Sequence, residues 1–204
     1  MVKFTVIGGG ASKDLAKRLA RKLKAVYIET ETKIFPDGES KVTLGKIPKK
    51  SVILVVQSTY PPVDTNLLQA LSIISQVRKI SSRTFAIMPY MGYARQDKQF
   101  LSGEVITMSV VAKMLQSAGA KKVIVVDIHS NTALNHFNIP TENVSAMPEL
   151  ANYFKKLNLK NPLVVSPDVG GSSRSKKFAS LLKTDFIVLK KHRDRKTGRV
   201  SIQT

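Results

Sequence analysis

Continuous apolar runs of strand length recur along this chain, and a segment with helical periodicity follows most of them. The clearest run is SVILVVQ at 51–57, where five consecutive aliphatic residues, 52–56, show no alternation with polar ones. A strand of this kind is buried on both faces, which is typical of a parallel sheet covered by helices on either side. The sequence therefore predicts an α/β fold with a mostly parallel sheet. Comparable runs lie at 2–8, 84–90, 121–129, 162–168 and 186–191.

The segments between these runs have the spacing of amphipathic helices. In residues 12–24, Leu15, Leu19 and Leu23 recur at helical spacing while basic side chains fill the other sides. We expect this helix to begin at about Ser12 and to be an ordinary amphipathic one. The other expected helices lie at 65–80, at 105–120 with an end near Gly119, from about Pro148 and from about Gly170.

Net charge and amino-acid composition indicate which classes of molecule this protein can bind. The chain has 33 basic and 14 acidic residues, a net charge of +19, which predicts attraction to polyanions such as nucleic acids, nucleotides or sugar phosphates. There is no zinc-finger spacing, recognition-helix signature or aromatic-interleaved basic strand, so nucleic acid is the less favoured partner. There is also no signal peptide, no apolar stretch of about 20 residues and no cysteine. We expect a cytoplasmic protein without a membrane partner.

Polar side chains follow four of the predicted strands at the point where each strand ends. Ligands of parallel sheets bind at that edge, which makes these residues the candidates for a site. Glycines and hydroxyls that open a helix present N–H groups to phosphate, and carboxylates beside an imidazole suit a magnesium ion that arrives with phosphate oxygens. The combination predicts a phosphoryl-transfer site. The segments are 95–98, Asp127 with His129, 168–174 and 190–193.

Each feature also has a structural interpretation. Asp168, before a Gly-Gly pair, caps the following helix as readily as it binds a ligand, and PDGE at 36–39 has the composition of a turn. His136 is expected to be a packing or surface residue. GGGAS at 8–12 predicts a tight strand-to-helix turn, because Lys13 stands where a dinucleotide motif needs its third glycine. The co-occurrence of polar groups at four strand ends favours the functional interpretation.

Four segments resemble the motifs of ribose-phosphate pyrophosphokinases, the phosphoribosyl pyrophosphate synthetases, in order and spacing. They are FPDGE (35–39), PYMGYARQDK (89–98), VVDIHS (125–130) and VVSPDVGGSSR (164–174). The resemblance runs from about Phe4 to the last residue, and Phe100 with Gly103-Glu104 resembles the shorter archaeal form of one loop. It implies two type I phosphoribosyltransferase-like domains with mostly parallel sheets, at 1–145 and 146–204, the second incomplete in this chain.

The resemblance implies transfer of the pyrophosphoryl group of Mg-ATP to the anomeric hydroxyl of ribose 5-phosphate, which gives phosphoribosyl pyrophosphate and AMP. Mg²⁺ is the implied cofactor, and a homodimer or higher homo-oligomer is the implied assembly. By the same resemblance Phe35 stacks on adenine, while Asp37 and Glu39 read its edge from the neighbouring subunit. Arg95 and Gln96 hold the phosphates and the adenosine portion of ATP.

The remaining implied roles concern the metal and the transferred group. His129 and Asp168 lie beside the magnesium, and Lys191 and Arg193, on a loop that is mobile in the family, stabilise charge at the β-phosphorus. A shift of one position in that alignment makes Lys190 the catalytic lysine and puts His192 in place of the arginine.

Several features depart from the family pattern. Many members have an acidic residue at the position of Phe100 and a proline at that of Val105. The motif that binds ribose 5-phosphate, with paired aspartates and a Thr-Gly-rich loop, is not found. We therefore expect a fragment of a longer enzyme or a naturally shortened paralogue, inactive as it stands.

Two other functions stay open. One is a catalytically silent regulatory homologue, which the presence of His129, Asp168 and Lys191 disfavours. The other is a basic nucleic-acid-binding protein, which only the net charge supports.

Overall fold

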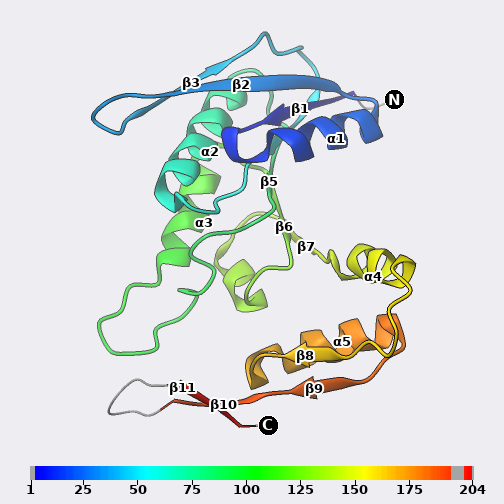
Figure 1. Ribbon diagram of the computed structural model, residues 1–204. Coiled ribbons are helices and arrows are strands. Elements are labelled where there is room, and N and C mark those ends of the chain that lie inside the picture. Colours follow the sequence, from blue (N-terminus) through cyan, green and yellow to red (C-terminus); the bar gives the residue numbers. More distant parts are fainter. Residues whose placement is uncertain (1–2, 194–199, 204) are drawn as a thin grey trace. The chain divides into compact units, whose positions relative to one another are not determined.

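The computed structural model describes residues 3–193 and 200–203, which form two compact units, Met1–Val144 and Ser145–Thr204 (Figure 1). We refer to them as unit 1 and unit 2. Their assignment to two phosphoribosyltransferase-like domains at 1–145 and 146–204 stays a prediction. In the described residues, no helix combines the length and the apolar character needed to cross a membrane.

Unit 1 is built on one seven-stranded sheet in the order β3-β2-β1-β4-β5-β6-β7. All neighbouring strands run parallel except β2 and β3, which pair antiparallel. The predicted α/β fold with a mostly parallel sheet is therefore confirmed. The strands are β1 (Phe4–Gly8), β2 (Val26–Ile34), β3 (Ser40–Leu44), β4 (Val52–Val56), β5 (Thr84–Met88), β6 (Lys122–Val126) and β7 (Thr141–Val144).

Helices cover both faces of this sheet. Strand β4, the run that suggested a doubly covered sheet, is buried at every residue. Alternate side chains of β1 and β4 enter two cores: Ile7 and Ile53 pack with α2 (Val63–Arg78) and α3 (Thr107–Ala118), and Val6 and Leu54 pack with α1 (Lys13–Leu23) (Figure 1). Helix α3 ends at Gly119 as predicted, because φ is +117° there and a Cβ would lie 2.4 Å from Arg78 Cδ.

Short elements complete unit 1. The 3-10 helices η1 (Gly10–Ser12) and η2 (Asn131–His136) follow the ends of β1 and β6, where the sequence predicted only turns or loops. Strand β7 was not predicted, because its sequence TENV has no apolar pattern. Its extended conformation is stabilised by the parallel pairing with β6.

Unit 2 contains a parallel pair of strands, β8 (Val164–Ser166) and β9 (Phe186–Val188), with helices α4 (Met147–Lys156) and α5 (Ser172–Leu182). The rings of Phe154 and Phe178 meet edge to face, 5.9 Å apart, between the two helices. A third helix, η3 (Val169–Gly171), precedes α5.

The single strand predicted at 186–191 is wrong. Strand β9 stops at Val188, and Lys190 begins β10 (Lys190–Arg193), which pairs antiparallel with β11 (Val200–Gln203). The Leu189 amide still donates to the Ser166 carbonyl, at 2.9 Å, so the change of partner comes directly after it.

Candidate nucleotide site

The segment Arg95–Lys98 lies between the end of β5 and the start of α3. Its backbone is fixed on both sides, because the Gln96 amide donates to the Tyr93 carbonyl at 2.9 Å and the Met108 amide donates to the Gln96 carbonyl at 3.1 Å. The side chains of Arg95 and Gln96 are exposed. Two flexible polar side chains are therefore presented to solvent from a backbone that is itself held in place.

Asp97 is the anchor of this segment. Its side chain is only 6% exposed, and its carboxylate accepts a hydrogen bond from the hydroxyl of Thr132 in η2. His136 Nε2, at the other end of η2, donates to the Asp97 carbonyl oxygen at 2.7 Å. The hydrogen bond from Thr132 is the main reason why the pKa of Asp97 lies below its ordinary value, with a smaller contribution from Ser130. Helix η2 thus ties the polypeptide after β6 to the polypeptide after β5.

These contacts revise the interpretation of His136. The sequence predicted a packing or surface histidine, and the ring is indeed partly buried, but it also holds the backbone beside Arg95 and Gln96. Thr132 was not singled out at all. The only hint in the sequence was the polar run at 130–132, directly after the predicted strand.

The loop after Lys98 carries one departure from the family pattern. Glu104 Oε2 accepts hydrogen bonds from the amides of Phe100 and Leu101, at 2.9 and 3.1 Å. The Lys98 ammonium lies 5.1 Å from the centroid of the Phe100 ring, which is 61% exposed. Phe100 therefore stands at the surface of a loop that Glu104 closes.

His129 lies at the end of β6, the parallel neighbour of β5, so it shares the sheet edge that carries Arg95. Its side chain is exposed. The turn before it is unusual, because Asp127 has a positive φ of 42° and the Ile128 amide donates to Asn143 Oδ1 at 3.2 Å. Polar groups therefore follow two neighbouring strand ends at the same edge of the sheet. That Arg95 and His129 share one site stays a prediction.

FPDGE forms the tip of the β2–β3 hairpin. The Phe35 amide donates to the Glu39 carbonyl at 2.8 Å, and the Glu39 amide donates to Asp37 Oδ1 at 3.1 Å. The interpretation of PDGE as a turn is therefore confirmed, with a φ of +90° at Gly38. Asp37 and Glu39 are exposed, while Phe35 is half-buried with the Lys33 ammonium 5.3 Å from its ring centroid. Strands β1 and β4 separate this hairpin from β5.

Asp168 in unit 2 caps a helix. Its Oδ1 accepts a hydrogen bond from the Gly171 amide at 2.8 Å, and its carbonyl accepts one from Ser166 Oγ, also at 2.8 Å. The helix-cap interpretation is therefore confirmed, and the other carboxylate oxygen is not used by the cap. The backbone of Lys191 and Arg193 belongs to β10, while their side chains lie outside the described residues.

A magnesium site was predicted at His129 and Asp168. Within residues 3–193 and 200–203 there is no group of three or more His, Cys, Asp or Glu side chains that could hold a metal ion. This donor set fits Mg²⁺ only in its usual binding mode, in which one or two protein oxygens supplement water and substrate phosphates. His129 belongs to unit 1 and Asp168 to unit 2, so their common site stays a prediction.

The chain is similar to known proteins over most of its length. Residues 4–119 match the family model described as the N-terminal domain of ribose phosphate pyrophosphokinase. A ribose-phosphate pyrophosphokinase of Methanobrevibacter smithii is 40% identical over 92% of this chain and 63% of its own length. The corresponding protein of Sulfurisphaera tokodaii is 34% identical over 97% of this chain and 68% of its own length.

A solved structure agrees with these relatives. The crystal structure of phosphoribosylpyrophosphate synthetase from Mycobacterium smegmatis superposes with a TM-score of 0.84 at 27% identity. The match covers 99% of this chain and 67% of that one. The chain thus spans about two thirds of the length of the proteins it resembles.

Proposed function

This chain belongs to the ribose-phosphate pyrophosphokinase family, and on that premise we propose that it binds Mg-ATP for transfer of the pyrophosphoryl group to ribose 5-phosphate. The products are phosphoribosyl pyrophosphate and AMP. The observation that carries the proposal is the anchored segment after β5, where buried Asp97 fixes a backbone from which Arg95 and Gln96 project into solvent.

Arg95 and Gln96 are proposed to hold the nucleotide. An arginine presents a planar fork of donors that matches phosphate oxygens, and a glutamine carboxamide both donates and accepts hydrogen bonds. Both side chains are exposed in the described structure and are free to close on a ligand, while the hydrogen bonds of Gln96 to Tyr93 and Met108 keep their starting point fixed.

The reaction asks for positioning and positive charge rather than for a covalent nucleophile, because the transferred phosphorus passes through a loose, metaphosphate-like transition state. Mg²⁺, when bound, supplies part of that charge, and His129 and Asp168 are the residues proposed to lie beside it. Lys191 and Arg193, or Lys190 and His192 if the alignment shifts by one residue, are proposed to stabilise the charge at the β-phosphorus.

A neighbouring copy of the chain is proposed to complete the adenine site with Phe35, Asp37 and Glu39. These residues lie at the tip of the β2–β3 hairpin, two strands away from β5 in the sheet of the same chain. The exposure of Asp37 and Glu39 at a hairpin tip supports a contribution to another copy, and a homodimer is the smallest assembly that provides one.

Replacement of Arg95 tests the proposed site. Arg95→Ala is expected to weaken binding of Mg-ADP at least tenfold by calorimetry, since a charge-assisted bidentate contact is lost. Arg83→Ala is the matched control, because Arg83 is also exposed but precedes β5 at the opposite edge of the sheet. Equal affinities of both variants would refute the assignment.

Phe35→Ala is expected to reduce ATP affinity tenfold or more without unfolding the protein. Stacking of a base on an aromatic side chain contributes about 1–3 kcal/mol, and the half-buried ring has no place in the two cores of unit 1. Calorimetry with ATP checks the affinity, and circular dichroism checks the fold. An unchanged affinity in a folded oligomer would contradict the role of Phe35.

Asp168→Asn is expected to reduce nucleotide binding more in the presence of Mg²⁺ than in its absence. The asparagine still accepts the hydrogen bond from the Gly171 amide, so the helix cap is kept while the charge beside the metal is lost. Titration of ADP with and without Mg²⁺ separates the two effects. If both affinities fell by the same factor, Asp168 would act only as a cap.

A further inference from the structure

We propose that Tyr93 and Asp64 are positioning residues for the nucleotide, because their hydrogen bond fixes the turn that presents Arg95. This role rests on the proposed function, in which Arg95 holds the phosphates of the nucleotide. Asp97 ties the segment Arg95–Lys98 to the polypeptide after β6. Tyr93 and Asp64 fix the start of the same segment, on the side of β4 and α2.

Arg95 lies at a corner of a tight turn. The Gln96 amide donates to the Tyr93 carbonyl at 2.9 Å, which closes a β-turn that begins at Tyr93. Its two central residues are Ala94 and Arg95. Ala94 is 3% exposed and belongs to the core formed with α2 and α3, whereas the side chain of Arg95 is exposed. The direction in which Arg95 leaves the protein therefore depends on the backbone of Tyr93.

The backbone of Tyr93 has an unusual conformation. Its φ is +62°, in the left-handed region that a bulky residue rarely adopts. The neighbouring Gly92 is needed for space, because a Cβ on it would lie 2.8 Å from Val63 Cγ1 in the first turn of α2. A residue in this region keeps its conformation only where its surroundings hold it in place. The contacts of Tyr93 therefore decide where Arg95 points.

The side chain of Tyr93 is held at two places. Its ring packs against the core formed with α2 and α3, and its hydroxyl donates a hydrogen bond to Asp64 Oδ1 in the first turn of α2. This hydrogen bond is the main reason why the pKa of Tyr93 lies above its ordinary value, so the phenol keeps its proton at neutral pH. Asp64 is exposed and Tyr93 is partly buried, so the hydrogen bond competes with water and contributes little to the free energy of unfolding.

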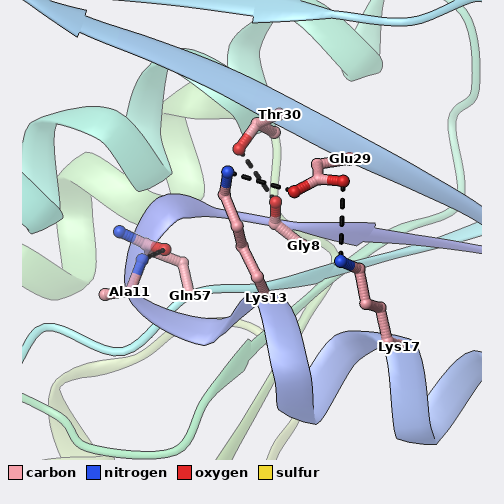
Figure 2. Close-up of polar contacts among 7 residues, drawn as sticks. All are labelled: Gly8, Ala11, Lys13, Lys17, Glu29, Thr30 and Gln57. Atoms are coloured by element: carbon pink, nitrogen blue, oxygen red, sulfur yellow. Dashed lines mark hydrogen bonds and ion pairs between the residues drawn. The ribbon is translucent and has the colours of Figure 1, made fainter.

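Asp64 belongs to a helix start that is itself fixed. Asn66, in the same turn of α2, is buried: its Oδ1 accepts from Gln57 Nε2 at 3.2 Å, and its Nδ2 donates to the Tyr60 carbonyl at 2.7 Å. Gln57 follows β4 and is completely buried, and its Oε1 accepts from the Ala11 amide at 3.2 Å, as Figure 2 shows. The start of α2 is therefore fastened to the polypeptide that follows β1 and β4.

Thr59 fastens the polypeptide before the turn. Its hydroxyl donates to the Tyr90 carbonyl at 2.9 Å and accepts from the Gly92 amide at 2.7 Å. The side chain of Thr59 is only 1% exposed, so its loss would disturb the fold. The contact of Tyr93 with Asp64 reaches solvent and can be removed alone, which makes it the place to test positioning.

The test compares binding of Mg-ADP by calorimetry with thermal unfolding of the 204-residue protein. Tyr93→Phe keeps the ring and removes the hydroxyl. It should weaken binding about fivefold to tenfold, because a misplaced arginine loses part of a charge-assisted hydrogen bond, and should lower the melting temperature by no more than about 3 °C. Tyr153→Phe, the same change at an exposed residue of α4, is the matched control and should leave the affinity unchanged.

Two variants of Asp64 test whether Tyr93 acts through it. Asp64→Ala and Asp64→Asn remove the same charge, but only the asparagine keeps an oxygen that accepts from the Tyr93 hydroxyl. Asp64→Ala should therefore bind Mg-ADP about fivefold more weakly than Asp64→Asn. Equal affinities of the two variants would overturn the proposal, because the Tyr93 hydroxyl would then act without Asp64.

A double-mutant cycle shows whether the effect reaches the nucleotide through Arg95. In the Arg95→Ala protein, Tyr93→Phe should change the affinity for Mg-ADP by less than about twofold, since the arginine that it positions is absent. An equal loss in both backgrounds would contradict the positioning role. If Arg95→Ala weakened binding and Tyr93→Phe did not, this inference alone would be wrong. If Arg95→Ala itself bound as tightly as the parent protein, the proposed nucleotide site would fail and the inference with it.

Discussion

Asp97→Ala is expected to reduce affinity for Mg-ADP on the order of hundredfold, although Asp97 need not touch the ligand. Its carboxylate is buried and accepts a hydrogen bond from Thr132, so its loss removes the contact that ties the backbone of Arg95 and Gln96 to η2. Misplacing Arg95 and Gln96 weakens two hydrogen bonds to a charged ligand, each of which contributes about 1.5–3 kcal/mol, and a total loss of about 3 kcal/mol is a factor of about 100 in affinity. The lost hydrogen bond should also lower the free energy of unfolding by about 0.5–1.5 kcal/mol.

A pair of conservative variants separates positioning from general destabilisation. Thr132→Val removes the donor at constant shape and should weaken binding in the same direction, whereas Thr132→Ser keeps the hydroxyl and should restore most of the affinity. Affinity is measured by calorimetry well below the melting temperature of each variant. If Thr132→Val bound as tightly as the parent protein, the hydrogen bond to Asp97 would have no part in positioning the nucleotide.

These contacts also mark where prediction from the sequence ended. The continuous apolar run at 52–56 predicted a strand that is covered on both faces, because an uninterrupted apolar pattern can be recognised from the residues themselves. The hydrogen bond from His136 to the Asp97 carbonyl joins residues 39 positions apart, and no sequence pattern near either residue predicts it. Here the contact depends on β5 and β6 being neighbours in the sheet, which the residues around Asp97 and His136 do not encode by themselves.

Two predictions from the sequence were limited by competing local interpretations of the same residues: the role of Asp168 and the end of the strand at 186–191. The Asp168-x-Gly-Gly sequence is compatible with a helix cap and with a metal ligand. The structure shows that Asp168 caps the helix, and this cap is compatible with a second role as a metal ligand. At 186–191 the apolar run continued to Leu189, but the pairing of Lys190 with Gln203 overrode it and started a new strand. Propensity marks where a strand can form, while the available partner decides where it ends.

A polypeptide of these 204 residues is expected to bind Mg-ADP and to form no AMP from ATP and ribose 5-phosphate. The residues proposed for the nucleotide, Phe35, Arg95, Gln96 and His129, are all in the described part, and a ligand that binds only the folded state raises the melting temperature. The family motif for ribose 5-phosphate is not found in this sequence. Without it the attacking hydroxyl loses its alignment, and alignment of that kind supplies about 7–11 kcal/mol of a reaction barrier.

The assay follows AMP release with both substrates, and thermal unfolding with Mg-ADP shows in the same samples that the nucleotide is bound. The full-length ribose-phosphate pyrophosphokinase of Methanobrevibacter smithii is the positive control. A shortened form of the same protein, limited to the part that aligns with this chain, is the matched control. If both short polypeptides bind the nucleotide but form no AMP, the loss of activity is due to the missing binding site for ribose 5-phosphate. Robust AMP formation by the 204 residues would mean that the sugar phosphate is held by residues within this chain, at a place that the family motifs do not indicate.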